Sequence, residues 1–227
     1  MNILAFKISG KFWHFRKFYT TTSPLSFSFP PFTVIRWIIA GVLWKEKDIY
    51  NEDFSKIKLW VEINFDTSNK KMFGLNLTNT KDNWHIQVKQ ETLINPSYTI
   101  YVWSENFQEY EKLKQLLEKN EFVYTPYLWL AMFIANIKYL WEEKNIEKVS
   151  LENIEVDSII PVEEIKNGDN LILTENQFIE FEKIPYSMDN ERNLQKLQGF
   201  AFDTNVWKIK LKSFSWYDFK WEKIYLV

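Results

Sequence analysis

Hydrophobic and polar positions alternate most clearly between residues 57 and 65. Five alternate positions in this segment are apolar: Ile57, Leu59, Val61, Ile63 and Phe65. A period of two is typical of a strand that buries one face, so the pattern predicts a strand here. The mostly apolar run Asn2–Ile8 and the segment Tyr98–Trp103 predict two further strands.

Two other stretches have the pattern of helices. Residues Thr33–Lys45 are apolar on nearly all sides, which predicts a buried helix with Thr33 as its N-cap. Asn106 and Glu109 match a capping box, and a helix that ends near Asn120 should follow them. Its apolar face would be formed by Phe107, Tyr110, Leu113 and Leu117.

A second apolar run, Tyr127–Ile137, predicts the last strand of the core. It lies in the segment Tyr124–Lys138, in which Thr125 and Pro126 indicate a turn before the strand. This run and the apolar helix are both well short of the roughly 20 residues that span a bilayer, so both are expected in the core. The elements then follow the order βαββαβ, and we predict an α+β fold.

The polar segment Asp66–Gln90 separates two of the predicted core strands. Lysines lie among its aromatic residues, which indicates a protruding hairpin with its turn near residues 79–83. After about Val149 the chain changes to short strand-like runs punctuated by Pro, Gly and Asn. We therefore predict a core domain at 1–148, with the hairpin at about 66–92, and a β-rich C-terminal region at 149–227.

Positive and negative charges are unevenly distributed along the chain, and the N-terminal segment is purely cationic. The formal net charge is −2, yet the first 45 residues contain six Lys or Arg and no Asp or Glu. This segment therefore carries +6 and the remainder −8. The cations are interleaved with aromatic residues between residues 11 and 19, a combination that suits a polyanion with unstacked bases. The pattern indicates nucleic-acid binding.

Composition removes several other classes of chemistry. The chain has no Cys and only two His, so disulfides and cysteine-zinc sites are excluded and a buried transition-metal site is not expected. A carboxylate site for magnesium stays open, but we predict no metal and, without a Gly-rich nucleotide motif, no cofactor. Lys7 interrupts the N-terminal apolar run, which is not the pattern of a signal peptide. We expect a cytoplasmic protein with no membrane contact.

The segment 11–32 contains the main candidate binding residues. Arg16 is one of only three arginines in the chain, and its guanidinium suits phosphate contact and base stacking. Tyr19 is the best candidate for stacking, and neighbouring hydroxyls can donate to phosphates. The full set is Lys11, His14, Arg16, Lys17, Tyr19, Thr20, Thr21, Thr22 and Ser23. A solvated basic loop, with aromatic residues in the core and hydroxyls capping turns, is the alternative.

Two further groups complete the candidate set. Arg36, near the start of the predicted helix, could reach the same nucleic acid or pair with a core carboxylate, and both interpretations stay open. The candidates in the predicted hairpin are Lys70, Lys71, Trp84, His85 and Lys89. They could clamp RNA or a neighbouring subunit, or the hairpin could simply be exposed to solvent.

Three stretches carry a resemblance to a known family. They are GKFWHFRKFYTTTSPLSFSFPPFTVIRWIIAGVL at 10–43, VKQETLINPSYTIYVW at 88–103 and TPYLWLAMFIANIKYL at 125–140. In this order and spacing they resemble the Cas-five subunits of type I CRISPR Cascade complexes, most closely the type I-B branch, over roughly the first 140 residues. The chain departs from that pattern at Trp37 and Trp129, where such families usually have glycine.

The resemblance implies a ferredoxin-like (RRM-like) core of the RAMP superfamily, with a β-hairpin thumb and a small C-terminal β region. It implies a non-catalytic subunit that caps one end of Cascade in antiviral defence and holds the 5′ handle of the CRISPR RNA. The implied partners are the Cas-seven backbone and the Cas-eight type large subunit, with target DNA as an open further contact. The hairpin predicted above would be the thumb.

A metal-independent endoribonuclease is the rival interpretation, as in the type I-C relatives that mature CRISPR RNA. Such chemistry needs a base for the 2′-hydroxyl and an acid for the leaving 5′-oxygen, and His14, Lys17 and Tyr19 are the nearest candidates in sequence. The chain has no adjacent Lys-His pair of the type I-C kind, and neither His has a neighbouring carboxylate in sequence. We therefore expect no enzyme activity. A third interpretation is an interaction protein whose basic loop binds acidic protein surfaces.

Overall fold

The structure is a computed structural model that describes most of the chain. Outside the description lie residues 1, 47–53, 55–56, 80–83, 104–108, 129, 145–147, 157, 166–168, 176, 206–207, 220–221 and 225–227. The fold is α+β and consists mostly of antiparallel sheets with few helices. None of the described helices combines the length and the apolar character needed to cross a membrane.

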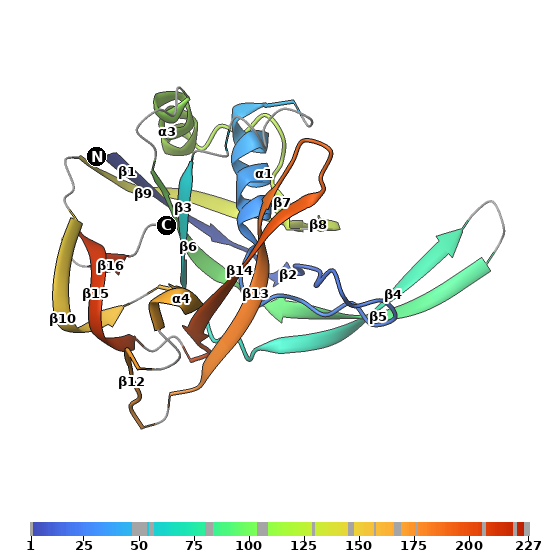
Figure 1. Ribbon diagram of the computed structural model, residues 1–227. Helices are drawn as coiled ribbons and strands as arrows, with labels where there is room; N and C mark the ends of the chain where they lie inside the picture. The colour runs from blue at the N-terminus through green and yellow to red at the C-terminus, as the bar shows by residue number, and fades with distance from the viewer. Residues whose placement is uncertain are drawn as a thin grey trace.

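A four-stranded antiparallel sheet forms the centre of the molecule (Figure 1). In spatial order its strands are β3 (Lys58–Ile63), β6 (Ser97–Trp103), β1 (Asn2–Ser9) and β9 (Asn136–Lys144). Helices α1 (Phe32–Leu43) and α3 (Tyr110–Lys119) contact each other, and α3 also contacts β9. Three predicted strands and both predicted helices are confirmed at these positions.

The ends of α1 follow from its backbone geometry. The N-cap is Pro31, and no side chain caps the first turn, so the prediction of Thr33 as the N-cap is wrong. The C-cap is Trp44 in the left-handed conformation, with φ 57°, and its backbone N–H donates to Ala40 O. The helix is apolar on nearly all sides because it is enclosed by the core, and Thr33 is buried with the rest.

Helix α3 has the amphipathic pattern that the sequence predicts. It buries Tyr110, Leu113 and Leu117, and it ends at Asn120, which is left-handed as is common at helix C-termini. Only one of the two residues of the predicted capping box lies within the described part of the chain. Asn106 and Phe107 lie outside the described residues, and Glu109, at the N-cap, makes no side-chain capping bond.

A long two-stranded hairpin extends away from the body of the molecule (Figure 1). It consists of β4 (Lys70–Asn79) and β5 (Trp84–Ile94), and the base of β5 also pairs with β2 (Phe12–Trp13). The polar segment therefore forms the hairpin that the sequence predicts. Its turn, predicted near residues 79–83, falls between the two strands and lies mostly outside the described residues.

The last strand of the central sheet is not where the apolar run predicts it. The run forms a small sheet of β7 (Tyr127–Leu128) and β8 (Leu130–Ile134), in which Met132 and Ile134 are 73% and 63% exposed. The strand that pairs with β1 is β9, with the more polar sequence NIKYLWEEK. An edge strand needs only one apolar face, and that face of β9 is formed by Ile137, Tyr139 and Trp141.

The aromatic side chain at position 37 lies beside this small sheet. Trp37 is half-buried and meets the ring of Tyr127 edge-on, with 5.3 Å between ring centroids. Both residues line an apolar cavity of about 590 Å³ between α1 and the segment before β7. The chain thus accommodates a tryptophan where glycine is usual in the family that it resembles. Trp129 lies outside the described residues.

The C-terminal region is built from two small antiparallel sheets. One contains β10 (Lys148–Val156), β15 (Ile209–Phe219), β12 (Leu171–Ile172) and β16 (Glu222–Ile224). The other contains β11 (Ile160–Pro161), β14 (Leu194–Asp203) and β13 (Ile179–Met188), next to the short helix α4 (Val162–Ile165). The region is β-rich, as the change in sequence pattern predicts.

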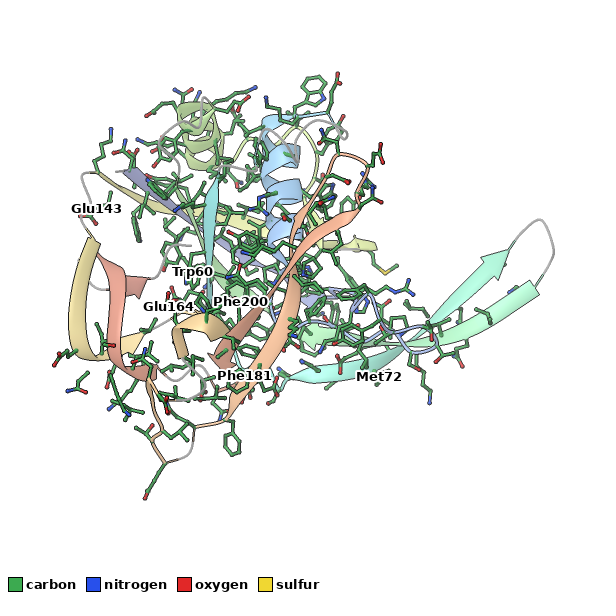
Figure 2. All side chains as sticks on the ribbon, in the orientation of Figure 1. Trp60, Met72, Glu143, Glu164, Phe181 and Phe200 are labelled. Atoms are coloured by element: carbon green, nitrogen blue, oxygen red, sulfur yellow. The ribbon has the colours of Figure 1, made fainter. Side chains whose placement is uncertain are left out.

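The β13–β14 hairpin packs on the main core rather than apart from it. Phe200 is fully buried and contacts the rings of Phe29, Phe32 and Trp60, with centroid separations of 6.1, 5.3 and 6.0 Å. Figure 2 shows the labelled Trp60 and Phe200 together in the interior. One continuous apolar cluster therefore joins the first half of the chain to β14.

Candidate nucleic-acid interface

The basic segment between β2 and α1 forms a narrow, closed loop. Its two sides are joined by backbone hydrogen bonds from Lys17 N to Leu25 O and from Phe27 N to Phe15 O, each 2.8 Å long. Arg16 also forms an isolated antiparallel bridge with Ser26. These contacts leave residues 18–24 as the loop tip and give a long segment without regular structure a defined shape.

Glu91, in β5 of the hairpin, holds one side of this loop. Its carboxylate Oε2 accepts a hydrogen bond from Ser26 N at 2.9 Å, and its backbone N–H donates to Pro24 O at 2.9 Å. Its carbonyl oxygen accepts from His14 Nδ1 at 2.7 Å. The loop and the base of the hairpin are therefore one connected surface.

Glu182, in β13, holds the other side of the loop. Its carboxylate accepts from Lys17 Nζ at 2.7 Å and from Ser28 N at 2.9 Å, with only 8% of the side chain exposed. Burial alone would lower the pKa of Lys17, but the charge of Glu182 outweighs it and the pKa is raised. Lys70 in β4 donates to Ser28 Oγ at 3.0 Å and extends the network to the hairpin.

Two of the predicted binding residues lie in the interior. His14 is fully buried, and burial lowers its pKa because a charged imidazolium would lose its hydration. Arg36 is 3% exposed, and its guanidinium donates to Phe54 O and Tyr186 O. Neither side chain reaches the surface in this structure, so neither has a route to direct contact with RNA here.

The remaining loop candidates are largely exposed. Tyr19 is 60% exposed, and the ring of the neighbouring Phe18 supports it edge-on at 5.2 Å. Thr20 is half-buried and caps the turn, since its Oγ1 donates to Lys17 O at 2.7 Å. The exposed candidates are Lys11, Arg16, Tyr19, Thr21, Thr22 and Ser23. The basic segment thus combines exposed cations with the hydroxyls and the accessible aromatic ring of the loop tip.

The hairpin has two chemically different faces. Residues directly opposite each other in an antiparallel pair share a face. One face carries Lys70, Met72, Gly74, Asn76 and Thr78 opposite Leu93, Glu91, Lys89, Gln87 and His85, and we call it the polar face. The loop is bonded to this face through Glu91 and Lys70. Phe73, Leu75, Val88 and Ile86 lie on the opposite face, where Phe73 meets Phe12 at 5.3 Å.

The predicted binding residues of the hairpin are distributed over both of its faces. Lys70, His85 and Lys89 lie on the polar face, and His85 is hydrogen-bonded to Thr78 at 3.1 Å. Lys71 lies on the opposite face, paired with Thr92. Trp84 opens β5 at the far end of the hairpin, and its side chain lies outside the described part of the chain.

The exposed groups of this surface are of the types that contact nucleic acids. Across the described ranges, no three His, Asp or Glu side chains gather in a way that could hold a metal ion. The surface offers guanidinium and ammonium groups for phosphates, hydroxyls as donors and an exposed aromatic ring for a base.

Comparison with solved structures finds a similar fold in a CRISPR complex. A chain of the "CRISPR RNA-guided surveillance complex" aligns with a TM-score of 0.56 at 10% identity, covering 92% of this chain and 91% of that chain. At this identity the likeness shows a shared α+β fold and nothing about the role of this chain. No model of a known protein family matches the sequence, and no curated protein sequence matches it.

Two further structures are more distant. The "Crystal structure of Cas protein" aligns with a TM-score of 0.48 at 9% identity, covering 90% of this chain and 95% of that chain. A chain of "Type III-B Cmr-beta bound to cognate target RNA" aligns with a TM-score of 0.47 at 10% identity, with 93% and 86% covered. No conclusion is drawn from either.

Sequence reasoning missed the residues that hold the loop. Glu91 and Glu182 lie 65 and 154 residues from the loop atoms that they bind, so no local pattern indicates them. It also missed Phe181, which is 58% exposed on β13 and lies beside the loop. An aromatic residue between Glu180 and Glu182 in a strand-like run is the one signal that could have indicated it.

Proposed function

We propose that the chain is a non-catalytic, RNA-binding subunit of a type I Cascade interference complex, of the Cas-five kind. In this role it caps the 5′ handle of the CRISPR RNA and contacts the Cas-seven backbone and Cas-eight type large subunits in the cytoplasm. The shared fold with a chain of a CRISPR surveillance complex supports the setting. The three sequence stretches that resemble the Cas-five family support the role.

The topology of the central sheet supports a ferredoxin-like core. The elements β1, α1, β3, β6, α3 and β9 follow each other in a βαββαβ order. In space the strands lie in the order β9, β1, β6, β3, so the first and third strands of the motif occupy the centre. The hairpin between the second and third strands is then an insertion that serves as the thumb.

A single observation carries the RNA-binding proposal: the basic loop and the polar face of the hairpin form one connected surface. Arg16, Tyr19 and Lys89 are exposed on elements that Glu91 and Lys70 tie together. An RNA backbone could follow the cations while unstacked bases meet the aromatic ring. A surface held in advance also lowers the entropy cost of ordering on binding.

The position of His14 supports a non-catalytic role over an endoribonuclease. A general base must come within hydrogen-bond reach of the proton that it abstracts. His14 is fully buried, and its Nδ1 is engaged by the carbonyl oxygen of Glu91. The nearest histidine candidate for catalysis is thus occupied in holding the loop.

The test is to co-purify the chain with the products of neighbouring genes and to sequence the bound RNA, including its 5′ ends. The wild type is compared with Arg16→Ala and Tyr19→Ala, both at exposed positions. We expect RNA with uniform 5′ ends, in lower yield from the variants. Uncut precursor in a variant would indicate an endoribonuclease, and the absence of RNA from the wild type would refute the proposal.

A further inference from the structure

A groove lies between the loop and the β13–β14 hairpin, and the sequence singles out only its loop side. It has a volume of about 480 Å³. The loop contributes Lys17, Phe18 and Tyr19, and the two strands contribute Glu180, Phe181, Glu182, Lys183 and Leu197. This volume is within the range of small-ligand pockets, roughly 300–1,000 Å³, and is ample for one nucleobase.

Both the loop and β13 contribute accessible aromatic residues to this groove. Phe18 and Tyr19 are 54% and 60% exposed on the loop, and Phe181 is 58% exposed on β13, where Figure 2 labels it. Large apolar rings are rarely left this exposed in one place without a partner. Their flat faces are suited to stacking, which is worth about 1–3 kcal/mol per base and tolerates any base.

The charges of the groove favour a base over a phosphate. Its lining contains two lysines and two glutamates, so it has no net attraction for an anion. The Lys17 ammonium is already bound to the Glu182 carboxylate at 2.7 Å. Glu180 and Lys183 are both exposed, and they offer an acceptor and a donor to the polar edge of a base.

We propose that this groove holds one unstacked nucleobase of the bound RNA, between Tyr19 of the loop and Phe181 of β13. The inference rests on the proposed function, because it names a base-binding position on the same RNA surface. Arg16 and Lys89 would contact the backbone outside the groove, and the groove would take a base from it. Phe181, Glu180 and Lys183 thereby become RNA-contacting residues in the C-terminal region.

The test measures the affinity of the full chain for a fluorescein-labelled 12-nucleotide single-stranded RNA by fluorescence anisotropy, between about 50 and 200 mM salt. Loss of a stacking contact should weaken binding about fivefold to about a hundredfold in Phe181→Ala. The slope of log K against log salt should stay unchanged, since no phosphate contact is lost. Arg16→Ala should instead weaken binding and reduce the magnitude of that slope by about 0.7.

Phe178→Ala is the matched control. Phe178 is 63% exposed just before β13 but does not line the groove, so its loss should leave affinity within about twofold. Phe181→Leu, which keeps an apolar side chain and removes the ring, guards against an effect on folding. Tyr19→Ala combined with Phe181→Ala should cost less than the two single losses added together, because both rings contact one base.

The outcomes separate the two proposals. If the wild type does not bind RNA, the proposed function fails. If the wild type binds and Arg16→Ala weakens it, but Phe181→Ala and Phe181→Leu behave like Phe178→Ala, the groove proposal alone is overturned. A lower salt slope in Phe181→Ala would also overturn it, since that would indicate a backbone contact.

Discussion

The buried ion pair between Lys17 and Glu182 allows a direct test of how the basic loop is held. Glu182→Gln keeps the shape of the side chain but removes the charge that faces Lys17 Nζ at 2.7 Å and Ser28 N at 2.9 Å. The two side chains are only 17% and 8% exposed. The variant therefore leaves an ammonium group beside a neutral amide with little access to water.

The expected loss follows from this burial. Breaking a buried pair from one side costs about 3–5 kcal/mol. The Lys17 side chain is 17% exposed, so its ammonium group can regain part of its hydration in the variant. We therefore expect the free energy of unfolding to fall by about 2–3 kcal/mol. For a chain of this size 1 kcal/mol corresponds to about 2–4 °C, so Tm should fall by about 4–12 °C.

The assay is a double-mutant cycle measured by urea unfolding, with Lys17→Met, Glu182→Gln and the double variant. We expect the pair to show a coupling free energy of about 1.5–3 kcal/mol. The exposed pair Lys210–Glu155, 2.9 Å long with side chains 41% and 47% exposed, is the matched control and should give less than about 0.5 kcal/mol. Equal coupling in the two pairs would refute the reasoning that burial makes the loop contact strong.

Three further predictions concern stability. Burial lowers the pKa of His14 below 6.5, so the unfolded chain takes up a proton that the folded chain does not, and stability should fall as the pH drops below about 6.5. Between about pH 7.5 and 5.5 the wild type should lose more stability than His14→Gln, by at most about 1.4 kcal/mol per pH unit, and equal losses in the two proteins would contradict this. Phe200→Ala should cost about 3–5 kcal/mol in urea unfolding, against less than about 0.5 kcal/mol for Leu173→Ala at a 70% exposed position, and similar values would contradict the core packing. A chain ending at residue 148 lacks the Phe200 contacts and should show no cooperative thermal transition, whereas a sharp transition would support an independent 1–148 domain.

Local patterns predict those elements of the core whose apolar residues can only be accommodated by burial. The alternation at 57–65 and the apolar run of α1 describe faces that must be buried, and both elements form as expected. The pattern is misleading at Tyr127–Ile137, because an apolar run of this length fits a core strand and a small surface sheet equally well. The true edge strand, β9, needs only alternate apolar residues and was therefore harder to detect.

The candidate site is predictable only where exposure follows from the sequence itself. Arg16 and Tyr19 are exposed as expected, because the distant elements that contact the loop leave these two side chains uncovered. His14 and Arg36 differ, since their burial depends on Glu91, Phe54 and Tyr186, which are far away in the sequence. Burial by distant elements cannot be inferred from a local pattern of charge.

These contacts reduce the number of N-terminal cations that are available to bind a phosphate. Of the six cations in the first 45 residues, Lys17 and Lys45 are in ion pairs with Glu182 and Glu109, and Arg36 is buried.

The expected salt dependence of RNA binding is correspondingly weaker. Six phosphate contacts on a single strand would give a slope of log K against log salt of about −4. Lys11, Arg16 and Lys89 are the exposed cations of the loop and of the polar face of the hairpin, and three phosphate contacts give about −2. Release of Lys17 from its ion pair would add a fourth contact, so a measured slope near about −3 would mean that the Lys17 pair opens on binding. A slope near about −2 would mean that affinity depends substantially on base stacking.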